Sequence, residues 1–120
     1  MWDVLYTDEF GVWFQTLSED QQDAVFARVE LLVSEGPALG RPTVDTIVGS
    51  RHPNMKELRV SKGGAIRVLF AFDPKRQAVL LVGGDKSGRW KAWYTQAIPL
   101  SGRLVRRVPA PNRADLKGDS

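Results

Sequence analysis

The chain has 120 residues, enough for one hydrophobic core, so we expect a single domain. It has no cysteine and one histidine, His52, which excludes disulfides, thiol nucleophiles, zinc sites of cysteine and histidine, and catalysis by a histidine pair. No apolar run approaches the roughly 20 residues that span a bilayer, and the opening MWDVLYTDEF is acidic rather than basic as in a signal peptide. These features predict a cytoplasmic protein without a membrane segment, a metal or a cofactor.

The net charge of +3 is distributed unevenly along the chain. Residues 1–50 hold two basic and nine acidic side chains, a net charge of −7, whereas residues 51–107 hold thirteen basic and three acidic ones, a net charge of +10. This segregation predicts that the second half builds a cationic surface for an anionic partner. The alternative is an ordinary solvated surface on which charges cluster by chance.

The start of the chain predicts a strand that leads directly into a helix. Trp2, Val4 and Tyr6 alternate with other residues in the pattern of a short strand, and Thr7 offers a helix N-cap. Large apolar residues then recur at the spacing of one helix face, and we expect them to pack in the core: Phe10, Trp13, Phe14 and Leu17.

A second helix follows at once and completes a helical hairpin. Ser18 and Gln21 have the spacing of a capping box at its start, and Gly36 with Pro37 ends it. Between Pro37 and Pro53 the chain is rich in proline, glycine, serine and threonine, so we expect an ordered loop with at most one helical turn.

The second half predicts an antiparallel meander, because three strand patterns with short connections occur at residues 55–60, 66–72 and 78–82. A Gly-rich turn follows at 83–88. It lacks the glycine spacing of a P-loop, which argues against nucleotide binding. We expect this turn to expose Lys86 instead.

The last predicted element is a helix that begins at Trp90 and is broken at Pro99. Residues 100–108 fit either a short helix or a basic surface segment. We therefore expect an α+β domain over residues 1–108, followed by a disordered tail at 109–120.

Arg67 lies inside an otherwise apolar strand pattern and is the first candidate for a functional residue. Burying a lone cation in a sheet would be expensive. We therefore expect one face of the sheet to pack on helices and the other to be open, so that Arg59 and Arg67 point from the open face toward an anionic ligand.

Four segments of the second half, taken together and in order, carry a resemblance: MKELRV at 55–60, AIRVLFAFDP at 65–74, VLLVGGDKSG at 79–88 and WKAWY at 90–94. They resemble the RelE/ParE toxin superfamily, most closely its HigB branch of phage-derived Gp49-like toxins, over about residues 1–100. The resemblance implies a microbial ribonuclease-like fold of N-terminal strand, helical hairpin, three-stranded antiparallel meander and C-terminal helix. It also implies cleavage of messenger RNA on the ribosome and an oligomer with a HigA-like helix-turn-helix antitoxin that neutralises the toxin.

Site residues are implied by the same resemblance. Arg67 corresponds to the arginine of the second meander strand that contacts the scissile phosphate, and Arg59 and Lys56 correspond to the basic stretch of the strand before it. Lys86 corresponds to the cation after the last strand, and Tyr94 to the tyrosine of the terminal helix. The expected catalytic residues are Arg67, Lys86, Tyr94 and Arg59, and the expected RNA-binding residues are Lys56, Arg89, Trp90, Trp93 and Lys91.

Cleavage of RNA without a metal requires deprotonation of a 2′-hydroxyl, stabilisation of a pentacoordinate phosphate and protonation of the leaving 5′-oxygen. Arg67 and Lys86 are suited to the phosphate charge. Tyr94, beside these cations, is expected to act as the base or to orient the nucleotide, while Trp90 and Trp93 offer faces on which bases stack.

These assignments have alternatives. Trp93 also fits the core, Trp90 and Tyr94 also fit its edge, and Glu57 departs from the family pattern because some relatives carry a lysine there. A second hypothesis is a non-enzymatic module that binds RNA or blocks a protein target as a ParE-like toxin does. It predicts binding without strand scission.

Overall fold

The computed structural model describes residues 2–47, 55–60, 66–73, 75–85 and 90–105, and its elements confirm the predicted α+β class. In chain order they are β1 (Asp3–Tyr6), α1 (Asp8–Gln15), α2 (Glu19–Glu35), the 3-10 turn η1 (Gly36–Ala38), β2 (Val44–Thr46), β3 (Met55–Val60), β4 (Ile66–Phe72), β5 (Gln77–Asp85) and α3 (Trp90–Leu104). The predicted tail, the turn at 61–64 and His52 lie outside the described residues.

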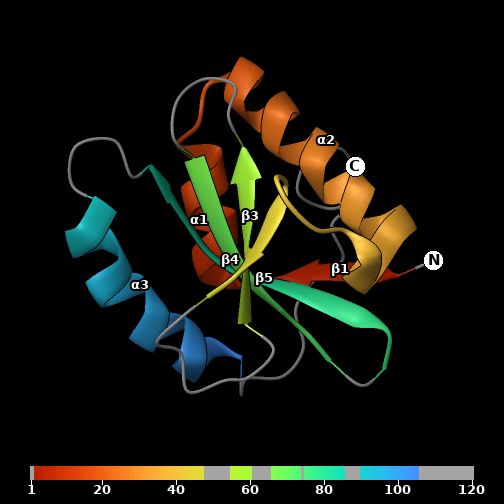
Figure 1. Cartoon of the computed structure of the whole chain (residues 1–120). Coiled ribbons are helices and arrows are strands. Elements are labelled where there is room, and N and C mark those ends of the chain that lie inside the picture. Colours follow the sequence, from red (N-terminus) through yellow and green to blue (C-terminus); the bar gives the residue numbers. More distant parts are fainter. Residues whose placement is uncertain (1, 48–54, 61–65, 74, 86–89, 106–120) are drawn as a thin grey trace.

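The described strands form one sheet in the order β1-β5-β4-β3-β2 (Figure 1). β3, β4 and β5 form the predicted antiparallel meander, and β1 adds to its β5 edge as a parallel strand. β2 adds to the other edge, antiparallel to β3. The expectation of a loop between Pro37 and Pro53 was therefore wrong for residues 44–46, because three residues are too few to produce a periodic pattern and only the pairing with β3 defines them as a strand.

Local capping groups fix the first helices as predicted. The Thr7 hydroxyl accepts a hydrogen bond from the Phe10 N–H at 3.0 Å and donates one to the Leu81 carbonyl at 2.7 Å, so the cap also ties α1 to β5. Ser18 and Gln21 form the reciprocal capping box of α2, with distances of 3.2 and 3.0 Å. These bonds satisfy N–H groups that a helix start leaves without partners.

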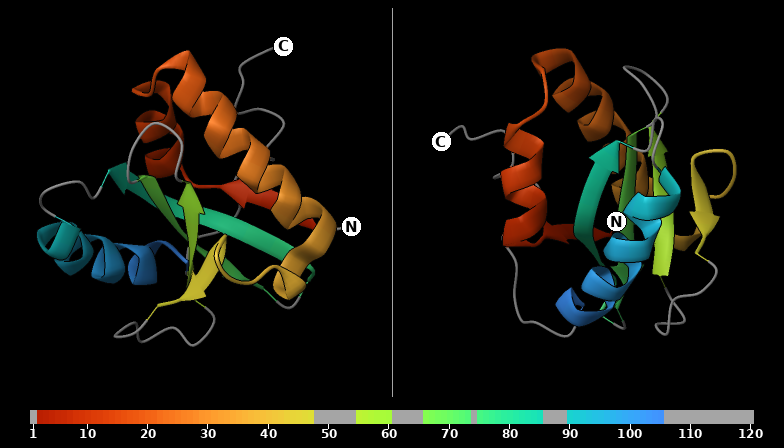
Figure 2. Two further views of the ribbon diagram at one scale, coloured as in Figure 1. Left: turned by 45° about the horizontal axis from the view of Figure 1, so that its top comes forward. Right: turned by 90° about the vertical axis from the view of Figure 1, so that its left-hand side faces the viewer.

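The sheet is covered by helices on both faces, and in Figure 1 α2 and α3 lie on opposite sides of it. α1 and α2 cover one face over a core that includes Phe10, Phe14, Val29, Leu32, Val68, Phe70 and Leu80. α3 packs on the other face over a smaller core of Met55, Leu69, Ala71, Leu81, Ala97 and Leu104. The expectation of a fully open second face was wrong, since α3 buries part of it (Figure 2).

α3 continues through Pro99 to Leu104, so the predicted break at Pro99 was also wrong. A proline inside a helix removes one N–H donor and strains the preceding turn. Ala97, Ser101 and Leu104 are nevertheless buried around it, and their packing against the sheet keeps the chain helical. No helix in the described part of the chain is long and apolar enough to cross a membrane.

Gly83 and Gly84 belong to β5 rather than to the predicted turn. A Cβ added to Gly83 would lie 2.3 Å from the ring of Trp13 on α1, and one added to Gly84 would lie 2.1 Å from Nε1 of Trp93 on α3. Successive strand residues face opposite sides of a sheet. The two glycines thus admit one indole on each face, which explains why glycine occupies strand positions here.

Candidate active site

Two arginines lie side by side on the sheet face that α3 partly covers. Arg59 on β3 is paired in register with Arg67 on β4, so both side chains leave the same face of the sheet. The Arg59 side chain is 36% exposed and that of Arg67 is 15% exposed. Two neighbouring cations at this depth need an anion between them.

That anion is Glu57, whose side chain is only 4% exposed. Glu57 Oε2 accepts a hydrogen bond from Arg59 Nε at 3.0 Å and lies 3.6 Å from Arg67 Nε. Its other oxygen, Oε1, accepts a hydrogen bond from the Tyr94 hydroxyl on α3. Glu57 is therefore the centre of a four-residue group, Arg59, Arg67, Tyr94 and Glu57, which we call the Glu57 cluster.

The sequence interpretation placed Arg59, Arg67 and Tyr94 in the site but treated Glu57 as a departure from the family pattern. The sequence did indicate that Glu57 lies near Arg59, because the two residues are two positions apart on a strand and such residues share a face. The sequence interpretation expected these cations to face an anionic ligand, whereas in the chain by itself they face a carboxylate of the protein.

Arg67 is the most constrained member of the Glu57 cluster. Its Nη1 donates to the Ile66 carbonyl at 2.9 Å, whereas its buried Nε has no hydrogen-bond partner in the described part of the chain. Burial lowers the pKa of Arg67, Glu57 raises it, and Arg59 lowers it again. With the ordinary pKa of arginine so far above neutrality the guanidinium stays charged, and its incompletely compensated charge is a strong attractor for a further anion.

The packing of the neighbouring residue Trp93 on the sheet determines where Tyr94 lies. The indole of Trp93 lies on Gly84, which is paired in register with Arg67, and its ring meets that of Tyr94 edge to face at 4.9 Å between centroids. Trp93 is partly buried against the α3 core. This is the packing alternative of the sequence interpretation, and it sets the phenol of Tyr94 over β3.

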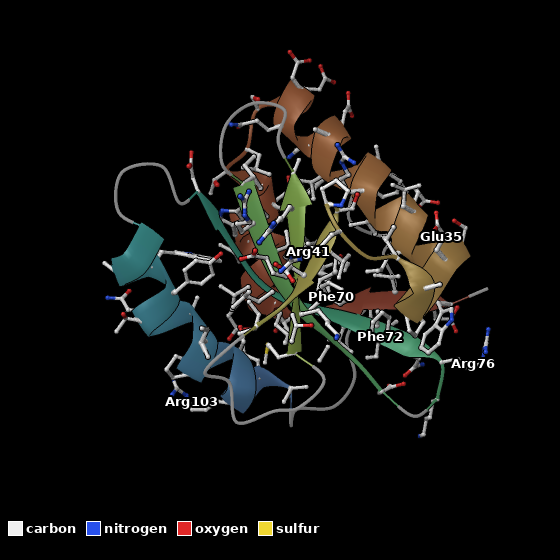
Figure 3. All side chains as sticks on the ribbon, viewed as in Figure 1. Glu35, Arg41, Phe70, Phe72, Arg76 and Arg103 are labelled. Atoms are coloured by element: carbon white, nitrogen blue, oxygen red, sulfur yellow. The ribbon has the colours of Figure 1, made fainter. Side chains whose placement is uncertain are left out.

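A second carboxylate, that of Asp45 on β2, also binds an arginine of the Glu57 cluster. Asp45 Oδ2 accepts a hydrogen bond from Arg59 Nη2 at 2.9 Å, and Oδ1 accepts bonds from Arg41 Nε at 3.2 Å and from the Thr46 N–H at 2.8 Å. The hydrogen bond from Arg41, followed by that from Thr46, lowers the pKa of Asp45. Neither Asp45 nor Arg41, which Figure 3 labels, was among the predicted site residues.

The other predicted site residues are not brought into the Glu57 cluster within the described residues. Lys56 is paired in register with Phe70 and leaves the α2 face, where its Nζ donates to Thr46 Oγ1 at 3.2 Å. Lys86 and Arg89 lie outside the described residues. Trp90 and Lys91 belong to α3, but their side chains also lie outside the described part.

Two further cations of the second half, Arg76 and Arg103, do not join the Glu57 cluster (Figure 3). Arg76 lies over the ring of Trp2 at 5.0 Å, and Figure 3 places Arg76 and Arg103 well apart from Arg41 and from each other. The positive charge of this half is therefore spread over several surfaces. What distinguishes the Glu57 cluster is its burial and its mixture of cations, carboxylate and phenol.

Comparison with solved structures confirms the RelE-like fold. The structure of Escherichia coli toxin RelE, as a double mutant in the free state, matches with a TM-score of 0.61 at 8% identity, covering 82% of this chain and 95% of that one. The archaeal RelE–RelB complex from Pyrococcus horikoshii matches with a TM-score of 0.56 at 14% identity, covering 72% and 97%. At such low identity the similarity concerns the fold alone.

Sequence relatives are much closer. "Putative toxin HigB3" of Mycobacterium tuberculosis is 54% identical over 98 residues, which is 82% of this chain and 85% of that protein. "Putative toxin HigB2" of the same organism is 50% identical over 93 residues, 76% of this chain, but the match spans about half of that protein, 46%. The family described as phage-derived protein Gp49-like (DUF891) matches residues 12–106. With this match across most of its length, the chain belongs to the Gp49-like family.

Proposed function

We propose that residues 1–108 form the toxin of a type II toxin–antitoxin system, which cleaves messenger RNA on the ribosome in the cytoplasm and so inhibits translation. One observation carries the enzymatic part of the proposal: Arg59 and Arg67 meet Glu57 and Tyr94 on one face of the sheet. The similarity to two proteins named "Putative toxin HigB2" and "Putative toxin HigB3" supports the biological context.

The group contains a side chain for each demand of metal-independent RNA cleavage. Arg67 and Arg59 stabilise the charge that develops on the phosphate, with Lys86 as a further cation. Glu57 accepts the proton of the 2′-hydroxyl, and the 2′-oxygen attacks phosphorus. Tyr94 donates its proton to the leaving 5′-oxygen, so the products are a 2′,3′-cyclic phosphate and a 5′-hydroxyl.

These roles differ from the first expectation for Tyr94, which was to act as the base or to orient the nucleotide. Tyr94 donates its hydroxyl proton to a carboxylate, and a phenol in that position is a proton donor rather than an acceptor. The same hydrogen bond allows the proton to pass back from Glu57 to Tyr94. After cleavage, the proton taken up by Glu57 can pass to the phenolate of Tyr94, because a carboxylic acid is much the stronger acid.

The state of the site in the free chain favours a substrate presented by the ribosome. Glu57 already binds Arg59 and Tyr94, so an RNA phosphate has to displace these contacts before the reaction begins. A message held by the ribosome supplies that positioning, whereas a loose strand does not. We expect ribosome-bound message to be cut efficiently and naked RNA poorly, with RNA contacts from Arg89, Trp90 and Lys91.

A HigA-like helix-turn-helix antitoxin is the proposed partner and forms an oligomer with the toxin. Inducing the chain in a bacterial host should arrest growth by lowering protein synthesis. Co-expression of the neighbouring gene product should restore growth, and the two chains should purify together. Normal growth and normal protein synthesis despite folded expression would refute the proposal.

A non-enzymatic RNA-binding or target-blocking module is the second candidate, and one observation favours it. Glu57 forms ion pairs with both arginines and accepts the Tyr94 hydroxyl, as a purely structural ion-pair network also would. Translation would then stop with the message intact. The charge-matched pair Arg67→Ala and Arg103→Ala separates the two, because only the first should abolish scission if the site is catalytic, and Arg103 is an exposed residue at the end of α3.

A further inference from the structure

Asp45 on the edge strand β2 has no place in the chemistry above, yet it holds one of the arginines that do. We propose that Asp45 is a positioning residue, which fixes the direction of the Arg59 guanidinium toward the RNA phosphate without touching the RNA itself. This inference rests on the proposed function, and it adds a residue to the site that the sequence did not indicate.

The two carboxylates are placed to hold Arg59 from two directions. Asp45 on β2 and Glu57 on β3 are paired in register, so both leave the same face of the sheet. Asp45 Oδ2 accepts from Arg59 Nη2 at 2.9 Å, and Glu57 Oε2 accepts from Arg59 Nε at 3.0 Å. Two charge-assisted bonds to different nitrogens of one planar group define its orientation as well as its position.

Asp45 can serve as a fixed reference because it is itself anchored. Its second oxygen, Oδ1, accepts the Thr46 N–H at 2.8 Å and Arg41 Nε at 3.2 Å. Of these two donors the Thr46 amide belongs to the sheet, whereas the Arg41 side chain is 77% exposed. The backbone bond should therefore hold Asp45 even when Arg41 is removed.

Without Asp45, Glu57 would be the one carboxylate among the described residues that binds Arg59. A guanidinium with one carboxylate partner prefers the bidentate geometry, in which two N–H groups bind the two oxygens. In this site that geometry competes with Tyr94 for Glu57 Oε1 and turns the exposed edge of Arg59 away from the substrate. The loss of Asp45 should thus impair both the cation and the base.

If Asp45 acted only through its charge, Asp45→Asn would improve RNA binding, whereas a positioning role predicts slower cleavage. Asp45 is an anion beside a site for RNA, so as a mere spectator it would repel the substrate. Asp45→Asn would then tighten binding of programmed ribosomes and leave the cleavage rate constant unchanged. As a positioning residue, Asp45→Asn should lower the rate constant at saturation by on the order of 10-fold to 10²-fold, because small misplacements of a catalytic group are expensive.

The experiment measures single-turnover cleavage of message on programmed ribosomes at saturating and half-saturating ribosome concentration. The variants are Asp45→Asn, Arg59→Ala, the double variant, and Arg41→Ala as the control that removes the exposed partner of Asp45. Thermal melts of all variants set an assay temperature at which each is folded.

The expected result is a loss of rate in Asp45→Asn, near wild-type rate in Arg41→Ala, and no further loss when Asp45→Asn is added to Arg59→Ala. Multiplicative losses in the double variant, or an unchanged rate in Asp45→Asn, would overturn the inference while the wild-type chain still cleaves. A wild-type chain that does not cleave at all would overturn the proposed function and this inference with it.

Discussion

Replacing Gly84 with alanine tests whether the packing of α3 on the sheet positions the phenol of Tyr94, the proposed proton donor. The added Cβ would lie 2.1 Å from Nε1 and 2.5 Å from Cε2 of Trp93, whereas an ordinary contact is at least 3.4 Å. The ring must therefore move by more than 1 Å, and Tyr94, the next residue of α3, must move with it.

The magnitude follows from the geometry. Overpacking of this kind typically costs about 1–3 kcal/mol of unfolding free energy. For a domain of this size that lowers the melting temperature by about 4–12 °C, at about 4 °C per kcal/mol. A misplacement of about 1 Å at a catalytic group costs on the order of 10²-fold in rate. We expect both effects in Gly84→Ala.

Gly83→Ala is the matched control. Its Cβ would lie 2.3 Å from the ring of Trp13 on α1, on the other face of the sheet. It should destabilise the fold to a similar degree but leave the cleavage rate within a few-fold of wild type below its melting temperature. Thermal melts paired with single-turnover cleavage on programmed ribosomes give both quantities. Wild-type stability and rate in Gly84→Ala would refute the packing argument, and equal losses of rate in both variants would refute its link to Tyr94.

Three further predictions concern the Glu57 cluster, its Asp45 neighbour and the fold. Arg67→Ala and Tyr94→Phe should each reduce cleavage on programmed ribosomes by on the order of 10² to 10³-fold, and full activity in both variants would eliminate the catalytic assignment. Tyr94→Phe should also lower the unfolding free energy by about 1.5–3 kcal/mol, because it removes the hydrogen bond to Glu57. The pKa of Asp45 lies below its ordinary value of 3.8, so its bonds stabilise the fold above that pH and are lost as the pH falls through the lowered value. The unfolding free energy of the wild type, measured in urea, should therefore fall more steeply below about pH 4 than that of Asp45→Asn, and parallel curves would contradict this. Ser18→Ala should lower the unfolding free energy by about 0.5–2 kcal/mol through loss of the α2 cap, without changing the rate of cleavage, and a wild-type denaturation midpoint would argue against the capping box.

Features that depend on neighbouring residues were predictable from the sequence. The caps at Thr7 and Ser18 are formed by side chains that reach three residues along the chain, so spacing alone identifies them. The strands β3 and β4 carry enough alternation and β-branched content to be recognised, and their short connection to each other predicts antiparallel pairing. Arg67 was conspicuous because it interrupts an apolar pattern.

Features that depend on distant contacts were not predictable in the same way. The parallel pairing of β1 with β5 joins residues more than 70 positions apart, as in Asp3 with Gln77. The strand character of Gly83 and Gly84 is explained only by the two indoles that pack on them. Glu57 departs from the family pattern in the sequence, and its contact with Tyr94 depends on the packing of α3 on the sheet.

The Glu57 cluster is proposed to cleave message on the ribosome. The most direct measurement maps the RNA ends that the purified chain produces from a defined message on programmed ribosomes, beside the same reaction with Glu57→Gln. We predict cleavage by the wild-type chain that leaves a 2′,3′-cyclic phosphate and a 5′-hydroxyl, and little cleavage by the variant at a temperature where it is folded. Intact message with both proteins, or equal cleavage by the two, would contradict catalysis by the Glu57 cluster.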